Sequence, residues 1–315
     1  MKLVLYICIF ISILTSSLNA TTQSFSVDND AFISSNDSHY TNGIFYTFMG
    51  DLNSSIDFEF MNDLQTNSAI SFTHLIFTPE DKNVTTPILD DLPYSGYMEL
   101  NFLLYKYTKN YFHEFGINLG MVGPVTKAKE IQSNFHTFTN NAEPKGWDTQ
   151  LKNKITAGLS YNFAKKTDKR ELKSLEYDWT NNFRLNVGTF YSGVLLSSTF
   201  RFGNNLLDTF ATTGNFIGGN ESALLNFKKS KTFNWSISFG IFANRVFNYY
   251  LIDEALKQGH TLPKIDYISG EQVSYDIFYK NFQYTFKIKS IYLRNNKFLS
   301  RASKQWGGVS ITWQY

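Results

Sequence analysis

The feature that most constrains this chain is a repeated alternation of apolar and polar residues, in runs that reach about nine to eleven residues. Large apolar side chains occupy every second position, and small polar side chains lie between them. This pattern is typical of β-strands with one apolar face, where aromatic and β-branched residues are favoured. The clearest runs are residues 155–163, 235–243, 273–279, 282–288 and 309–315, and weaker runs are 25–27, 44–48, 68–77, 94–104 and 112–122.

Two architectures contain many such strands. In a soluble β-sandwich the apolar faces form a shared core, whereas in a transmembrane β-barrel they meet lipid. The run length suits a tilted crossing of the bilayer. The aromatic residues, 17% of the chain, gather near strand ends, where aromatic girdles lie. The sequence therefore favours an all-β, transmembrane antiparallel β-barrel of about 12 strands, closed because an open sheet edge is unstable in lipid. A secreted sandwich is the alternative.

The two ends of the chain fit export to an outer membrane. Met1 and Lys2 precede an apolar run at residues 3–14 and a small residue at Ala20, which predicts a signal peptide over residues 1–20 and a barrel domain over 21–315. An N-terminal anchor helix is the alternative. Cleavage would remove Cys8, the only cysteine, so disulfides and thiol sites are not expected. The last run closes with Tyr315 and resembles the C-terminal signature of bacterial outer-membrane proteins.

Charge and loop lengths narrow the class further. A net charge of +2 argues against nucleic-acid binding, and a mean hydropathy of −0.25 is too polar for a helical membrane protein. Short turns such as Lys280-Asn281 are expected on the periplasmic side, and long loops outside. The long loops are predicted at residues 78–92, 123–151, 204–231 and 255–269.

Polar residues are concentrated where the first two predicted strands meet. Asp28, Asn29 and Asp30 directly follow an apolar strand, and their oxygens suit Ca²⁺, a hard cation. The segment His39–Gly43 opens the next strand and can lie beside Asn29 and Asp30 across the hairpin. Each segment also has a simpler explanation, namely a polar strand end and the turn chemistry of Asn-Gly.

The loop after the fifth predicted strand has the pattern of a short helix. Residues 123–138 begin with Gly-Pro and continue without either residue, which predicts about three helical turns. Ile131 and Phe135 share one face, and Gln132 and His136 share an adjacent face. We expect the apolar stripe to pack on the barrel rim and His136 to point inward, where a neutral imidazole beside a cation can act as a general base on water. A solvated loop histidine is the alternative.

Together these stretches resemble one known family, the lipid A 3′-O-deacylases of Gram-negative outer membranes. The matching stretches, in family order, are SFSVDNDAF, HYTNGIFYTF, PYSGYMEL, MVGPVTKAKEIQSNFH, PKGWDTQL, YSGVLLSSTFRFGNNL and GGVSITWQY. The resemblance implies a twelve-stranded barrel with a short helix in an extracellular loop and a site facing outward between that helix and the wall. It implies a Ca²⁺-dependent esterase that removes the 3′-linked acyloxyacyl group of lipid A. We expect a monomer surrounded by outer-membrane lipid.

The resemblance also assigns site residues. Its asparagine–aspartate pair falls on Asn29 and Asp30, its threonine on Thr41, and its helix glutamine and catalytic histidine on Gln132 and His136. His136 would take a proton from water, and Ca²⁺ near Asp30 would polarise the ester carbonyl and stabilise its oxyanion. Asn29 and Thr41 would hold the metal site or donate to that oxygen.

Three further positions are less determined by the resemblance. A loop lysine of the family could match Lys82 and a glutamate Glu143, although the loops align in more than one way. His39 precedes Tyr40 and stands where many family members carry an acidic or other polar residue. A non-catalytic porin or structural barrel is the alternative function.

Overall fold

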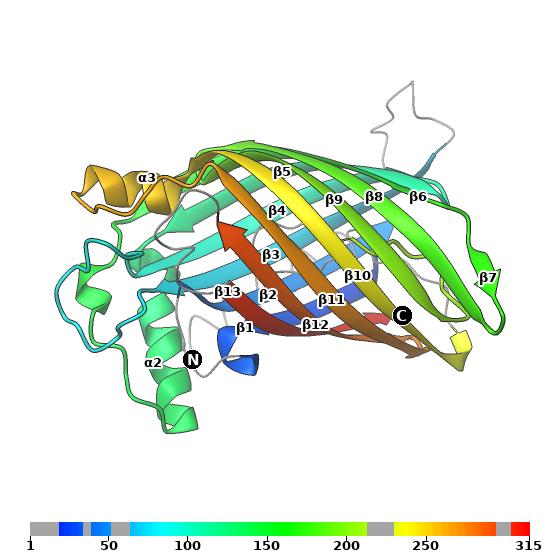
Figure 1. The fold of residues 1–315 in the computed structure, drawn as a ribbon, viewed down its shortest axis with the longest axis horizontal. Helices are drawn as coiled ribbons and strands as arrows, with labels where there is room; N and C mark the ends of the chain where they lie inside the picture. Colours follow the sequence, from blue (N-terminus) through cyan, green and yellow to red (C-terminus); the bar gives the residue numbers. More distant parts are fainter. Residues whose placement is uncertain (1–18, 34–38, 52–63, 213–229, 294–303) are drawn as a thin grey trace.

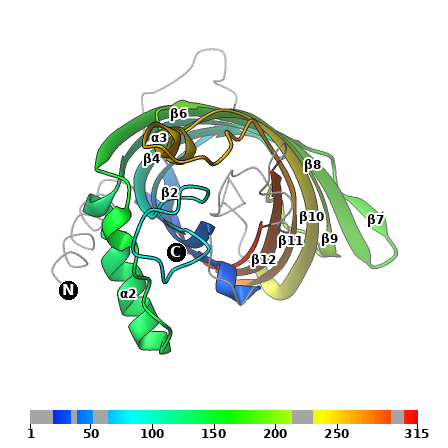
Figure 2. The same ribbon diagram turned by 60° about the vertical axis from the view of Figure 1, so that its left-hand side comes forward.

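A computed structural model of the chain describes residues 19–33, 39–51, 64–212, 230–293 and 304–315. In this part of the chain, twelve antiparallel strands close into one barrel (Figures 1 and 2). Strands adjacent in sequence are adjacent in the sheet, and the pairing of the first strand with the last completes the circle. None of the helices found there is long and apolar enough to span a membrane. The predicted barrel is confirmed, and the sandwich is excluded.

The barrel strands are β1 (Asn19–Asn29), β2 (His39–Asp51), β3 (Gln65–Thr78), β4 (Ser95–Tyr107), β5 (Tyr111–Val122), β6 (Lys154–Lys166), β8 (Leu175–Gly188), β9 (Tyr191–Asn204), β10 (Ser230–Tyr249), β11 (Tyr267–Lys280), β12 (Phe282–Leu293) and β13 (Lys304–Gln314). The short β7 (Arg170–Leu172) pairs only with the start of β8 and projects beyond the barrel (Figure 1). The helices are α2 (Ala128–Thr139) and α3 (Tyr250–Lys257), with short 3₁₀ turns η1 (Asp30–Phe32), η3 (Pro124–Thr126) and η4 (Trp147–Thr149).

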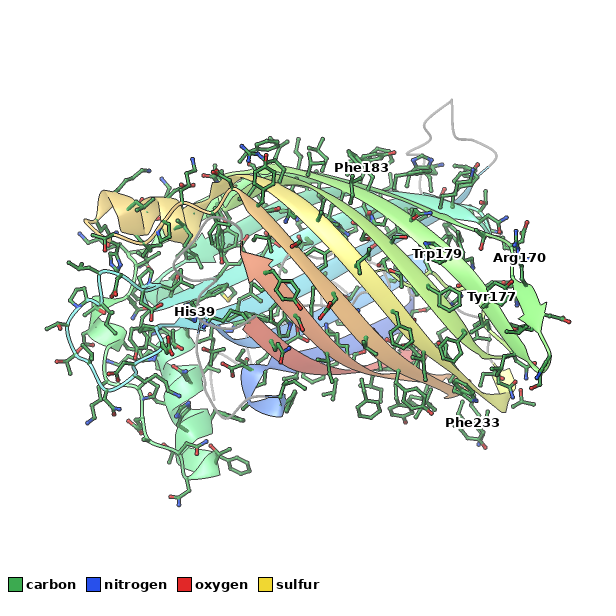
Figure 3. The ribbon with its side chains drawn as sticks, in the orientation of Figure 1. His39, Arg170, Tyr177, Trp179, Phe183 and Phe233 are labelled. Carbon is green, nitrogen blue, oxygen red and sulfur yellow. The ribbon has the colours of Figure 1, made fainter. Side chains whose placement is uncertain are left out.

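The two faces of the wall differ as the alternation predicts. On β6, Ile155 and Leu159 are exposed on the outside, whereas Thr156 and Ser160 are buried on the inside. Side chains of Tyr177, Trp179, Phe183 and Phe233 project from the outer surface in Figure 3. An outer surface of this kind suits lipid, because apolar side chains exposed in such number would be unfavourable in water.

Charged side chains inside the barrel form ion pairs with one another. Burying a charge is costly unless an opposite charge and hydrogen bonds compensate it. Three buried pairs cross between strands, namely Arg201–Asp178 at 2.5 Å, Arg184–Glu114 at 3.1 Å and Lys287–Asp28 at 3.1 Å. Each pair joins two strands that are adjacent in the sheet or separated by a single strand.

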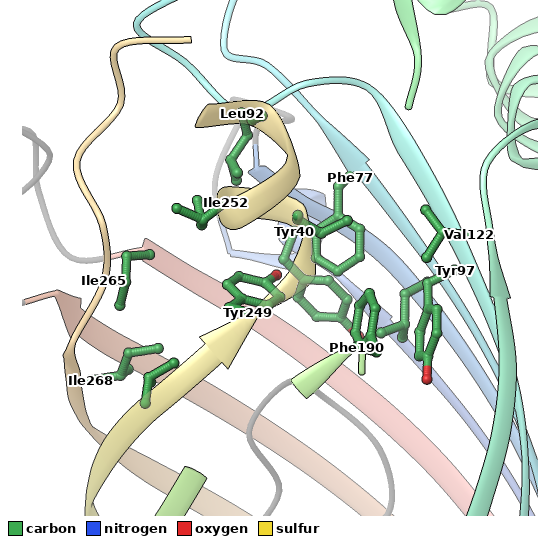
Figure 4. Packing of buried hydrophobic residues seen from close by; sticks show 14 of the residues in the cluster. Tyr40, Phe77, Leu92, Tyr97, Val122, Phe190, Tyr249, Ile252, Ile265 and Ile268 are labelled. Carbon is green, nitrogen blue, oxygen red and sulfur yellow. The ribbon is translucent and has the colours of Figure 1, made fainter. Parts of the chain in front are cut away.

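An apolar cluster occupies the lumen at the end of the barrel that bears α2 and α3. We call it the mouth cluster; it includes Tyr40, Phe77, Leu92, Tyr97, Val122, Phe190, Tyr249, Ile252, Ile265 and Ile268 (Figure 4). Six of these side chains point inward from strands, while Leu92, Phe190 and Ile265 come from loops and Ile252 comes from α3. Tyr97 and Phe190 stack with their ring centroids 3.5 Å apart. Apolar packing therefore fills this mouth.

The antiparallel order decides at which end each loop lies. The loops at residues 79–94, 123–153 and 250–266 lie at the α2 end, as the long-loop rule predicts. The start of the β9–β10 segment, at residues 205–212, lies at the opposite end, so the assignment of this loop to the same side as the others was wrong. Its residue Phe210 packs there against Phe112. The turn at Lys280 is confirmed, with β11 and β12 on either side of Asn281.

The predicted signal peptide lies almost wholly outside the described residues, which begin at Asn19 with β1. The predicted helix in the fifth loop is confirmed as α2.

Candidate active site outside the barrel wall

A cavity of about 1160 Å³ lies at the α2 end of the barrel. Val27, Ile44 and Ile76 line it from β1, β2 and β3. On β1, Val27 neighbours Asp28, which is buried in the lumen and paired with Lys287. Because successive side chains of a strand point to opposite faces, the cavity lies on the outer face of the wall. Its other side is formed by α2, which lies alongside the outside of the barrel (Figure 2).

Four of the predicted site residues line this one cavity. They are Asn29 from the end of β1, Thr41 from the start of β2, and Gln132 and His136 from α2. The less determined Lys82 and Glu143 line it as well. Asp30 is buried and begins η1, directly after Asn29, but it is not among the described residues that line the cavity.

His136 is held in one tautomer by the loop after α2. Asn140, at the C-terminal end of the helix, has a left-handed backbone (φ 56°), and the chain turns back so that Ala142 approaches the imidazole. The His136 Nδ1–H donates to the Ala142 carbonyl at 2.6 Å. A carbonyl only accepts, so Nδ1 carries the proton and the basic lone pair is at Nε2. The imidazole is buried, with 5% of its residue exposed, and lines the cavity.

Asn29 and Thr41 are positioned by the strand ends. Asn29 caps η1, because its Oδ1 accepts from the Ala31 N–H at 2.7 Å. Thr41 lies where the β2–β3 pairing shifts register, and its hydroxyl lies 2.7 Å from that of Thr78. Strands β1 and β2 pair with Asn29 opposite Asn42. The proposed juxtaposition of these two segments across the hairpin is thus confirmed.

A tight contact fixes α2 against the barrel. The imidazole Nε2–H of His74 on β3 donates to the Thr126 carbonyl of η3 at 3.0 Å. Gly96 of β4 faces the same turn, and a Cβ there would lie 2.0 Å from Thr126 Oγ1 and 2.5 Å from Ala128 Cβ. The absence of a side chain at Gly96 is therefore what allows the start of α2 to approach the wall.

The buried face of α2 differs from the predicted one. Ala128, Gln132 and His136 are buried, whereas Ile131 and Phe135 line the cavity and remain 36% and 48% exposed. The expectation that the apolar stripe packs on the rim was wrong. Beside a lipid-facing wall, apolar side chains need not turn toward protein, so the hydrophobic stripe does not report the packed face.

The loop segment 79–94 forms another cavity wall and is tied at several points. His39 Nε2 lies 3.0 Å from Asp91 Oδ1, and His39 lies at the α2 end of the barrel in Figure 3. Asp91 also accepts from the backbone N–H of Glu80 at 2.8 Å and of Leu92 at 2.7 Å. Burial raises the pKa of Asp91, but the hydrogen bond and charge of His39, with these two N–H groups, outweigh it and hold that pKa below its usual value.

The same segment contacts two other loops. The backbone N–H of Thr261 donates to the Leu89 carbonyl at 2.7 Å, and the backbone N–H of Lys145 donates to the Lys82 carbonyl at 2.8 Å.

Sequence reasoning missed the His39–Asp91 pair because the two residues lie in separate segments with no spacing rule to connect them. It considered His39 as the start of a polar strand end and as a departure from the family, but not as a partner of Asp91.

The donor set partly matches what Ca²⁺ prefers. Asn29, Asp30 and Thr41 offer oxygen ligands, and the Asp30 carboxylate is buried, as suits a cation. The described residues contain no group of three or more His, Cys, Asp or Glu side chains that could hold a metal. A Ca²⁺ ion at this site would therefore draw further oxygens from backbone carbonyls, water or substrate.

The fold and the cavity define an outer-membrane type of β-barrel with its candidate site outside the wall, beside a loop helix. The chain belongs to the LpxR outer membrane protein family: the family model, described as outer membrane protein LpxR, matches residues 3–315. This places the protein in the Gram-negative outer membrane.

Among solved structures, the chain is similar to LpxR from Salmonella typhimurium, with 15% identity and a TM-score of 0.75 over 94% of this chain and 100% of that one. It also matches the β domain of the Bordetella autotransporter BrkA at 8% identity and a TM-score of 0.47, over 94% and 99% of the two chains. No curated protein sequence matches the chain. At this identity the Salmonella structure supports the barrel fold alone.

Proposed function

We propose that this protein is a Ca²⁺-dependent outer-membrane esterase that hydrolyses the 3′-linked acyloxyacyl group of lipid A, with its site facing outward. The observation that carries the proposal is the buried His136, whose Nδ1–H is bound to the Ala142 carbonyl within a cavity on the outer face of the wall. That tautomer is the one a general base needs, because Nε2 can then accept a proton. The family membership and the resemblance to lipid A deacylases support the same conclusion.

The surroundings of the cavity fit a lipid substrate. Ile44, Ile76, Ile131 and Phe135 supply apolar lining close to the outer surface of the barrel, so acyl chains could enter from the membrane without crossing water. Lys82 and Lys304 lie in the same lining and would attract the anionic groups of lipopolysaccharide. A cavity of about 1160 Å³ is large enough for the reacting ester and part of its chains.

The reaction follows from the residues that line the cavity. His136 Nε2 takes a proton from water while the oxygen of that water bonds to the ester carbonyl carbon. The bond from this carbon to the sugar 3′ oxygen then breaks, and the proton on His136 passes to the leaving oxygen. The products are a free 3′-hydroxyl and a carboxylic acid. Asn29 and Thr41 would orient the carbonyl.

Asp30, with Asn29 and Thr41 beside it, would hold Ca²⁺. When bound there, the ion would supply Lewis acidity that polarises the carbonyl.

The alternative, a porin, is less well supported because the mouth cluster fills one end of the lumen. Mass spectra of lipid A from cells with the gene, without it, and with it restored test the proposal. Loss of the 3′ acyl chains only when the gene is present is expected. Identical spectra would contradict the deacylase and leave a non-catalytic barrel.

A further inference from the structure

The side chain of Gln132 lies between the cavity and a buried tryptophan. Gln132 lines the cavity from α2, while Trp147, from η4, does not. The Trp147 indole Nε1–H donates to Gln132 Oε1 at 2.8 Å. Both residues are almost completely buried, at 3% and 1% exposure. The hydrogen bond is therefore shielded from competing water.

The chemistry of this hydrogen bond determines the orientation of the Gln132 amide. An indole N–H can only donate, so the amide atom that faces Trp147 must be the oxygen. The amide nitrogen is then turned away from Trp147. Nε2 of Gln132 is buried and has no hydrogen-bond partner among the described residues. An unsatisfied buried donor is unfavourable, which indicates that its partner is a group that enters the cavity.

Trp147 is itself rigidly placed. Its ring packs against Tyr94 with centroids 5.0 Å apart, in a buried cluster with Ile76 and Ala128. Gly146 permits this approach, because a Cβ there would lie 2.4 Å from the Tyr94 ring. The indole is thus held in one position, from which it orients the Gln132 amide.

We propose that Trp147 is a positioning residue that holds the Gln132 amide with its NH₂ group toward the cavity, where it donates to the oxygen of the substrate ester. Gln132 lies one turn before His136 on the buried face of α2, so a carbonyl beside the base would also be within reach of the amide. This inference rests on the proposed function and deepens it. Trp147 acts through Gln132 and does not itself touch substrate.

The test uses purified full-length barrel and compares kcat and KM for release of the 3′ acyl chains from lipid A. Gln132→Glu keeps the acceptor for Trp147 but has no donor, and we expect kcat to fall about 10²- to 10³-fold, as for loss of an oxyanion donor. Gln132→Met, which is uncharged, should lose as much. Equal losses would show that the charge of glutamate is not the cause.

Trp147→Phe keeps a ring against Tyr94 but removes the N–H. We expect kcat to fall about two- to tenfold, as for loss of one hydrogen bond, with KM little changed. Combined with Gln132→Met, it should cause no further loss, because Trp147 acts only through the amide. The control is Trp179→Phe on the outer surface, whose indole donates to Ser198 Oγ, and it should leave kcat unchanged.

Two results would overturn the proposal: wild-type kcat in Gln132→Glu, or losses from Trp147→Phe and Gln132→Met that multiply in the double variant.

A readout independent of activity separates this proposal from the proposed function. The indole ¹⁵N–¹H signal of Trp147 should persist near its wild-type position in Gln132→Glu and shift upfield in Gln132→Met. An unshifted signal in Gln132→Met would refute the positioning role even if the wild type cleaves lipid A. A wild type that cleaves no lipid A, with the shift present, would instead refute the deacylase.

Discussion

Replacing His136 tests the centre of the proposed mechanism. In His136→Ala the base is lost, together with the 2.6 Å hydrogen bond to the Ala142 carbonyl. General-base catalysis contributes about 10²- to 10⁴-fold to a rate, which corresponds to about 2.7–5.4 kcal/mol of transition-state stabilisation. The lost hydrogen bond contributes only about 0.5–1.5 kcal/mol to stability. We therefore expect a folded barrel with little activity.

His136→Gln refines this expectation. Its amide can form hydrogen bonds but cannot take a proton from water, so activity should fall as far as in His136→Ala. The assay is the initial rate of 3′ acyl release from lipid A in detergent, with heat-modifiable migration in gel electrophoresis as the measure of folding.

The control histidine must lie away from the cavity walls. His260 would be a poor choice, because its Nδ1 lies 3.2 Å from the carbonyl oxygen of Asp91 and so supports the loop segment 79–94. His113 on β5 lies instead beside Tyr161 of β6, with its Nδ1 2.8 Å from the phenol oxygen. His113→Ala should keep the wild-type rate. If His136→Ala also keeps it, the base is elsewhere and α2 is a binding surface only.

Three other perturbations address the metal, the loop and the helix contact. Chelation should abolish activity and added Ca²⁺ should restore it, and Asp30→Asn should raise the Ca²⁺ concentration needed; full activity under chelation would contradict the metal assignment. The pKa of Asp91 is lowered in the fold. The stability that its carboxylate gives to the loop segment 79–94 is therefore complete above the ordinary pKa of about 4 and is lost as the pH falls through the lowered pKa. Asp91→Asn removes this carboxylate at every pH and should therefore expose Lys82 to trypsin at neutral pH, and equal trypsin cleavage in both proteins would refute this. Gly96→Val should displace α2 and reduce activity about tenfold or more without unfolding the barrel, as mass spectrometry and gel mobility would report, and an unaffected rate would show that this close contact is not needed.

The barrel could be predicted from the sequence because its physical cause is local. Lipid outside and polar groups inside require alternation with a period of two, and this is readable in each strand separately. β8 and β9 escaped individual notice because Asn181 on β8 and Ser198 on β9 interrupt their outward apolar positions. The identity of α2 was also readable, since residues 128–139 contain neither proline nor glycine.

The errors arose where a local rule replaced a geometric one. The loop between β9 and β10 was assigned by its length, although antiparallel strands alternate in direction. Counting strands along the chain places that loop at the same end as the turn at Lys280, opposite α2. Alternation of direction is a strict consequence of the topology, whereas loop length is only a tendency.

The candidate site was partly predictable because two of its segments are joined by a hairpin and the other two residues share a helix. Asn29 and Thr41 meet through the pairing of β1 and β2, and Gln132 and His136 through their spacing on α2. The contacts that hold the β1–β2 hairpin and α2 close together cannot be read from either segment alone. It depends on the bare backbone at Gly96, the imidazole of His74 and the indole of Trp147.

Each of these three contacts joins residues from separate segments, and each residue looks ordinary where it stands in the sequence. A glycine in a strand pattern, a strand histidine and a loop tryptophan have many local explanations. Their common effect becomes apparent only when α2 is placed against β3 and β4: together they determine how far the helix lies from the wall and which atom of Gln132 faces the cavity. In this protein the chemistry is encoded locally by residue type, whereas the geometry that makes it usable is encoded by contacts between distant segments.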